Sequence, residues 1–145
     1  MTLDFGNIEK LKVTGDTLQK YPFDNIEMPG AYVMVAPATR ANKGFTTAQM
    51  SLALSYQRGG GKVRLSADKV NLLRDQMKPL YANHIVKGWG GIVDAAGIEA
   101  PFSQENALAF LRALPDQEFD DLVDFCTEEN NYRPMPFDIE EAAKN

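Results

Sequence analysis

The chain has 145 residues, of which 44% are hydrophobic and 24% are charged, and its formal net charge is −5. These values are typical of one soluble globular domain with a core of its own. A single cysteine excludes an internal disulfide. The sequence also contains neither an apolar signal-peptide segment nor a run of the ~18–20 apolar residues that would span a bilayer. We therefore expect a protein of a reducing compartment, without membrane association.

Charge is distributed unevenly along the chain. Nine Lys or Arg accompany two Asp between residues 40 and 87, a net charge of +7, whereas three accompany thirteen acidic residues between 93 and 145, a net charge of −10. The acidic half argues against nucleic-acid binding, because it would repel phosphates. The basic half suits either an acidic partner or the protein's own acidic half, and the sequence leaves both open.

The predicted elements begin with an N-terminal arm and end with an acidic tail. Residues 1–28 carry scattered apolar residues broken by prolines, which predicts a loosely attached arm. Residues 29–133 are expected to form a helix-rich globular domain, and residues 134–145 a short acidic tail. An apolar run near 31–36 predicts one short strand or hairpin.

Two helices are expected in the basic half. Thr46 is the predicted N-cap of the first helix, in which Met50 and Leu54 lie on one face. The second helix follows Ser66 and carries a long apolar stripe, which Pro79 is expected to kink or interrupt.

Further elements complete an α+β, mainly helical fold of about four to five helices. A hairpin-like link is predicted near 92–99, because Gly97 can take a positive φ. A helix capped by Ser103 follows, and another begins at Asp116, with Cys126 on its apolar face.

No catalytic, cofactor-binding or metal-binding site emerges from the sequence. The one histidine, His84, and the one cysteine, Cys126, both fall on apolar stripes, which is typical of core residues. The stretch RGGGKVR lacks the first glycine and the final Ser or Thr of a phosphate-binding loop. The acidic residues of 116–129 lack the spacing of a calcium loop and predict a solvated helix face. We therefore expect a protein that is not an enzyme and needs no cofactor.

The single tryptophan, Trp89, lies among glycines just after the long apolar stripe. We interpret it as a packing joint, because the glycines let the chain turn and the indole can fill the corner between two helices. Phe102, next to a predicted N-cap, is expected to pack as a hydrophobic staple. An exposed anchor for a partner is the alternative for Trp89.

The order of these segments has a parallel in a known family. The segments follow one another in this order: AYVMVAP, a helix pair ending in ANHIVKGW, GIVDAAGIEAPFSQENALAFLRALPD, FDDLVDFCTEENNYR and a terminal EEAAKN. This order resembles the small tail assembly chaperones of long-tailed bacteriophages, in which a Trp at a helix end precedes an acidic–Gly turn and a PFS-E-NA helix start. The resemblance extends from Met28 to Asn145. Gly90 and Gly91 depart from it, since a larger residue is expected after the Trp.

The resemblance implies a non-enzymatic function in the host cell cytoplasm. Such chaperones coat the long tape measure protein, keep it soluble and help to recruit the tail tube protein, and a homo-oligomer is compatible with that role. Two alternatives stay open. The first is a structural part of the particle, such as a connector or minor virion protein. The second is an inhibitor that binds a host protein through its acidic helices.

A helical client of this kind requires an apolar groove with a charged rim. Candidates for the rim are the basic residues in the middle of the chain: Arg58, Lys62, Arg64, Arg74 and Lys78. Tyr32 and Val33 are the candidates for the apolar floor, and a free strand edge beside them is a candidate site for a second copy.

Overall fold

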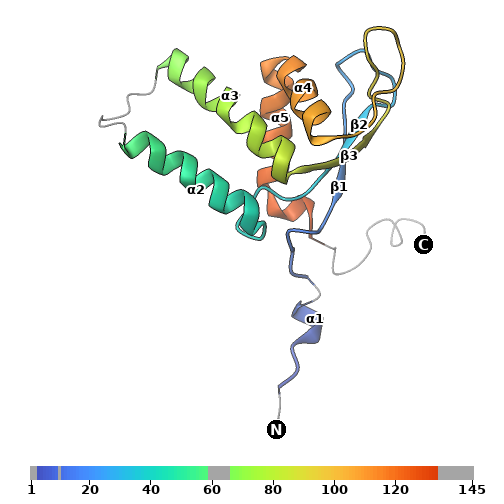
Figure 1. Ribbon diagram of the computed structural model, residues 1–145. Helices are drawn as coiled ribbons and strands as arrows, with labels where there is room; N and C mark the ends of the chain where they lie inside the picture. Colours follow the sequence, from blue (N-terminus) through green and yellow to red (C-terminus); the bar gives the residue numbers. More distant parts are fainter. Residues whose placement is uncertain (1–2, 10, 59–65, 134–145) are drawn as a thin grey trace, which may run out of the picture.

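The computed structural model describes residues 3–9, 11–58 and 66–133, and it confirms the α+β, mainly helical fold class. Within these residues, five α-helices, three strands and one 3-10 turn follow in the order α1 (Gly6–Glu9), β1 (Gln19–Pro22), β2 (Tyr32–Val35), α2 (Lys43–Arg58), α3 (Ala67–His84), β3 (Val86–Gly90), α4 (Gln104–Ala113), α5 (Asp116–Thr127) and η1 (Glu129–Asn131). Helices α3, α4 and α5 gather on one side of the sheet, and α2 lies beside α3 (Figure 1).

The sheet is antiparallel, with β2 as its central strand between β1 and β3. On one side Val35 pairs with Gln19, and on the other Val33 pairs with Trp89. The expectation of a free strand edge beside Tyr32 and Val33 is therefore wrong, because β2 is hydrogen-bonded along both edges. The strands that supply that pairing, β1 and β3, were not predicted from the sequence.

Residues 19–28 belong to the folded body and not to a loosely attached arm. β1 pairs with β2 over its whole length. Phe23, just after β1, is 3% exposed, and its ring packs edge to face on Phe110 of α4 with centroids 5.3 Å apart. The segment that holds α1 does leave the body (Figure 1), so the expected arm is shorter than predicted.

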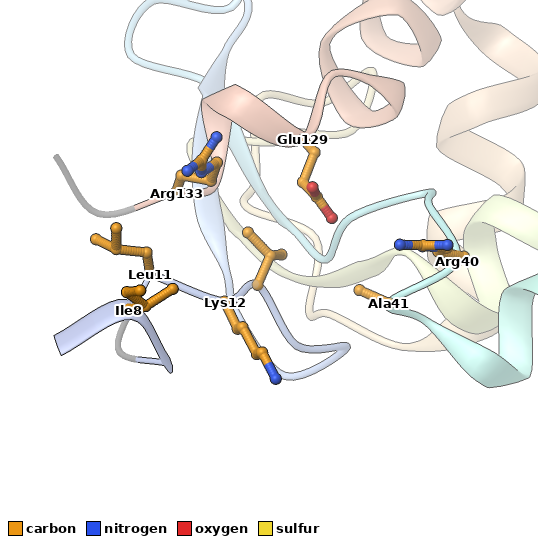
Figure 2. Close-up of a pocket in the computed structure, with 8 residues that line it drawn as sticks. Ile8, Leu11, Lys12, Arg40, Ala41, Glu129 and Arg133 are labelled. Atoms are coloured by element: carbon orange, nitrogen blue, oxygen red, sulfur yellow. The ribbon is translucent and has the colours of Figure 1, made fainter. Parts of the chain in front are cut away.

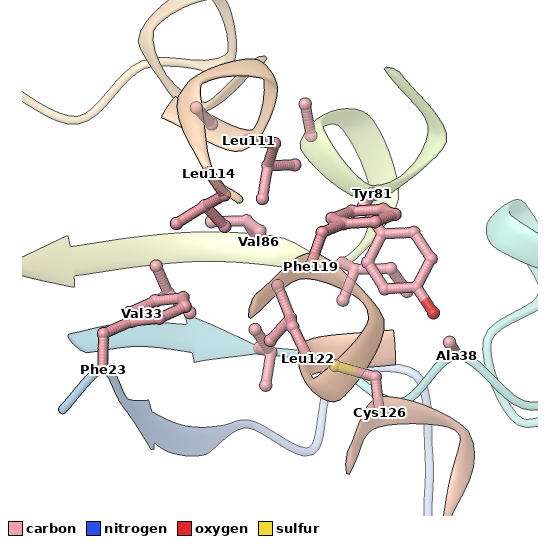
Figure 3. Packing of buried hydrophobic residues seen from close by; sticks show 14 of the residues in the cluster. Phe23, Val33, Ala38, Tyr81, Val86, Leu111, Leu114, Phe119, Leu122 and Cys126 are labelled. Atoms are coloured by element: carbon pink, nitrogen blue, oxygen red, sulfur yellow. The ribbon is translucent and has the colours of Figure 1, made fainter. Parts of the chain in front are cut away.

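The core lies between the sheet and the helices (Figure 3). Val33 of β2, Leu111 of α4 and Leu122 of α5 are fully buried in one cluster. Tyr81 of α3 joins three helices. Its ring packs edge to face on Phe45 of α2 and on Phe119 of α5, with 5.5 Å between ring centroids in each pair. Burial of large apolar side chains from every layer makes these elements one cooperative unit.

Helix starts follow their caps. The predicted caps Ser66 and Ser103 are confirmed, because each side-chain oxygen accepts the backbone N–H three residues on. The predicted cap Thr46 is wrong. Helix α2 begins earlier, and Asn42 Oδ1 accepts the N–H of Phe45 at 3.2 Å. Asn at an N-cap satisfies an N–H that the first turn would otherwise leave open.

Pro79 does not interrupt α3, which continues to His84. A proline inside a helix costs about 3 kcal/mol through its missing N–H and its ring. Tyr81 and Ala82 follow it in the fully buried core. Their packing holds the last turn in place, so the core outweighs the local preference.

The predicted link near 92–99 is a tight turn closed by one isolated bridge between Val93 and Glu99. Gly97 takes the expected positive φ, 80°, and its N–H donates to the Asp94 carbonyl at 2.9 Å. The link therefore has the local geometry of a hairpin without forming a continuous ladder.

Candidate protein-binding surface

Arg74, a candidate for a partner-binding rim, is engaged by the protein's own acidic half. Its Nε and Nη2 donate to Asp120 Oδ1 and Oδ2 at 2.8 and 2.9 Å, and its Nη1 lies 3.5 Å from the Asp116 carboxylate. These hydrogen bonds hold the pKa of Asp120 below its ordinary value. Arg74 therefore fits the internal alternative for the basic half and is not a free rim residue.

Two other candidates are buried. Lys78 is 4% exposed, with Nζ 3.4 Å from the Asp75 carboxylate and 5.5 Å from the centroid of the Phe119 ring. Val33 has no exposed surface. The expected rim and floor are therefore wrong for Lys78 and Val33, because neither side chain reaches a partner.

Lys62 and Arg64 lie outside the described residues, and so does the side chain of Arg58. Tyr32 is half-buried on the outer face of the sheet, and Lys20 Nζ lies 4.3 Å above its ring centroid. Tyr32 is thus the one candidate among the described side chains that keeps an uncharged, partly open surface.

Close contacts account for the two glycines that follow Trp89, Gly90 and Gly91. A Cβ on Gly90 would lie 2.5 Å from the ring of Tyr32, which covers this glycine across the strand pair. Gly91 has a φ of 71°, and a Cβ there would lie 2.9 Å from the carbonyl oxygen of Gly30. The departure from the larger residue expected here therefore reflects close backbone and ring contacts.

Trp89 lies in β3 and is half-buried. Its Nε1 donates to the carbonyl of Ala100 at 2.9 Å. Its ring packs edge to face on Phe102 at 5.3 Å and on Phe110 of α4 at 5.7 Å between centroids. The indole thus connects the sheet edge to the segment that leads into α4. The sequence had predicted instead that it would fill a corner between two helices.

Cys126 and His84 occupy structural positions. Cys126 has no exposed surface, and burial raises the pKa of its thiol to about 12, which keeps it protonated at neutral pH. The backbone carbonyl of His84 accepts a hydrogen bond from Asn42 Nδ2 at 3.0 Å, and the ring lies against Gly44. Among residues 3–9, 11–58 and 66–133, no three His, Cys, Asp or Glu side chains are placed to hold a metal ion.

The sequence did not predict that α2 exposes an apolar surface. Of the described α2 side chains, Phe45 is the one in the buried core. Met50 and Leu54 are 60% and 45% exposed, and they continue the helical spacing of Lys43 and Thr47, which are also exposed. This spacing places all four on the helix face opposite Phe45. We call Lys43, Thr47, Met50 and Leu54 the α2 outer face.

An open cavity of about 540 Å³ lies where the N-terminal segment meets the body (Figure 2). One wall comes from that segment, and the other comes from the residues just before α2 and from the end of the described chain. The lining residues are Ile8, Leu11, Lys12, Val13, Arg40, Ala41, Glu129 and Arg133. Its mixture of apolar side chains and both signs of charge is typical of a contact between segments rather than of a small-molecule site.

A family model described as YdaY prophage protein matches residues 40–133, which run from the start of the α2 region to the end of the described chain. No curated protein and no solved structure matches the chain. Within the described ranges, no helix is both long and apolar enough to cross a membrane.

Proposed function

The chain belongs to the YdaY prophage protein family, and we propose that it is a phage tail assembly chaperone. In this function the protein binds the tape measure protein in the host cell cytoplasm, keeps it soluble and helps to recruit tail tube protein. It catalyses no reaction and needs no cofactor. The family match supports the phage origin, and the α2 outer face supports a protein-binding role.

The observation that carries this proposal is the exposure of α2. This helix has 16 residues and is anchored in the core through Phe45, near its first turn. An isolated helix of ~12–15 residues is marginal in water, and most helical stability in proteins comes from packing of an apolar face. Met50 and Leu54 leave such a face uncovered. A client helix that packs on them would complete the structure of α2.

The charges around α2 suit a client helix with acidic flanks. Arg74 and Lys78 are already paired with carboxylates of the chain. Arg40, Lys43 and Lys69 are exposed. Of these, Lys43 lies on the α2 outer face, and a base at the end of an apolar stripe favours an amphipathic helix whose polar side is acidic, because charge complementarity guides orientation more than it adds affinity.

One alternative has an observation of its own. Asp121, Asp124 and Glu128 are exposed on and just after α5, which would suit an inhibitor of a basic host protein. However, two further α5 acids, Asp116 and Asp120, already bind Arg74. The acidic helix therefore has an internal partner, and the inhibitor ranks second.

Co-expression with the tape measure protein of the same prophage tests the proposal. We expect this chain to co-purify with it and to raise its soluble yield. The double variant Met50→Asp/Leu54→Asp should lose both effects. Leu72→Asp is the matched control, because Leu72 is also exposed, at 47%, but lies on α3.

Absence of co-purification, with the chain present at fixed copy number in purified particles, would overturn the chaperone proposal in favour of a structural part. Capture of a host protein that depends on Asp121 and Asp124, without capture of the tape measure protein, would favour the inhibitor.

A further inference from the structure

The segment before β1 exposes large apolar side chains that no part of the described chain covers. Leu3, Phe5 and Ile8 are 71%, 57% and 62% exposed. The single helical turn α1 holds no buried residue. Exposing three neighbouring large apolar side chains to water costs free energy, at about 25 cal/mol per Å² of apolar surface. We call this segment, residues 3–9, the α1 arm.

The α1 arm is attached to the body at its base. Leu11 and Val13 are half-buried and line the cavity beside Ala41, and Ile8, the last apolar residue of the arm, reaches its edge (Figure 2). From there α1 points away from the body and does not lie along its own α2 (Figure 1). The α1 arm of one molecule is therefore presented outward, where another molecule can meet it.

The same chain carries a surface that complements the α1 arm. The α2 outer face is apolar at Met50 and Leu54 and begins with exposed Lys43. Residues 3–9 are apolar with two acids, Asp4 and Glu9, and the bases of this part of the sequence, Lys10 and Lys12, come after them. Apolar area and opposite charge thus occur on two separate, uncovered parts of one chain.

We propose that the α1 arm of one copy packs on the α2 outer face of a second copy. The contact is heterologous, because it joins two different surfaces. Each copy has both, so the contact repeats from molecule to molecule and forms an open chain, or a ring if the rotation closes. Because the proposed client helix packs on the same α2 outer face, the α1 arm and the client compete for it, and self-association is a property of the chain without its client.

Analytical ultracentrifugation of the chain and of paired variants tests this contact. We expect the wild type to form dimers and larger species as concentration rises. The arm variant Leu3→Asp/Phe5→Asp and the α2 variant Met50→Asp/Leu54→Asp should each be monomeric alone. Mixed in equal amounts, they should form dimers and nothing larger, since one intact arm and one intact face remain.

Two control variants each add one negative charge, against the two that each double variant adds, and leave the proposed apolar contact in place. Asn7→Asp in the α1 arm and Leu72→Asp on α3 should both assemble as the wild type does, and circular dichroism checks that every variant is folded. A monomeric wild type, an arm variant that still assembles, or a mixture that stays monomeric would each overturn the proposal. The arm variant should still co-purify with the tape measure protein, so a failure of this contact is distinct from a failure of the chaperone function.

Discussion

Arg74 of α3 and Asp120 of α5 form a two-pronged ion pair, with Nε–Oδ1 and Nη2–Oδ2 distances of 2.8 and 2.9 Å. The planar guanidinium matches a carboxylate in this geometry, which a lysine does not reproduce. The pair joins the basic half of the chain to the acidic half and orients α3 against α5. It also shows that the basic and acidic halves of the sequence meet in the folded chain.

We expect the loss of stability caused by Asp120→Asn to depend on pH. Arg74 lowers the pKa of folded Asp120 below its ordinary value of 3.8. The pair therefore stabilises the folded state above that ordinary value and loses its contribution as pH falls through the lower, folded-state pKa. Urea unfolding midpoints should differ between wild type and variant at neutral pH and converge in acid. Asp124→Asn, on the same helix, is the control, and a difference that persists unchanged in acid would contradict this explanation.

Gly91 and Gly97 occupy positions that favour glycine for two different structural reasons. Both have positive φ, 71° and 80°, but a Cβ on Gly91 meets backbone atoms at 2.9–3.0 Å, whereas one on Gly97 meets nothing within 4 Å. Gly97→Ala should therefore cost about 1 kcal/mol from the left-handed backbone alone. Gly91→Ala should cost about 3 kcal/mol, because steric overlap adds to it. Equal losses in chemical denaturation would show that the close approach to Gly30 does not constrain this turn.

Trp89 should contribute to stability through its rings and its hydrogen bond separately. Trp89→Ala removes the contacts with Phe102 and Phe110, and we expect a loss of about 3 kcal/mol. Trp89→Phe keeps a ring but loses the bond from Nε1 to the Ala100 carbonyl, at about 1 kcal/mol. Indole emission typical of water, with an unchanged unfolding midpoint for Trp89→Ala, would instead favour an exposed partner anchor.

Tyr81 and Tyr132 should respond oppositely to loss of the hydroxyl. The buried Tyr81 hydroxyl has no hydrogen-bond partner among the described residues, whereas that of Tyr132 donates to the Ala36 carbonyl at 3.0 Å. Tyr81→Phe should therefore stabilise the protein by about 1 kcal/mol, and Tyr132→Phe should destabilise it by a similar amount. Thermal melting of the two variants checks this, and destabilisation by Tyr81→Phe would indicate that its hydroxyl has a partner.

The helices could be predicted because their signals are local. Ser66 and Ser103 begin helices by capping groups three residues away, and such contacts are visible in sequence. β3 could not be predicted in this way, because its glycines weaken any strand pattern and its pairing partner, β2, is about fifty residues distant. β1 was missed for a related reason: it is a four-residue edge strand ending in Pro22.

The candidate surface could be predicted only in part. An apolar pair such as Met50 and Leu54 is typical of a core stripe, since sequence spacing gives the face of a helix but not what covers it. The sequence also left open what Arg74 and Lys78 would pair with, because charge asymmetry does not say whether the opposite charge lies in the same chain. Tertiary contacts decide both points.

Hydrogen–deuterium exchange of this chain, free and bound to the tape measure protein, tests the central claim most directly. At a concentration low enough for it to be monomeric, the free chain should exchange amides of residues 47–55 readily, because this part of α2 holds no buried side chain. In the complex we expect those amides to exchange at least about tenfold more slowly, with α5 unchanged. Unchanged exchange in α2 together with protection of α5 would contradict the proposed binding surface.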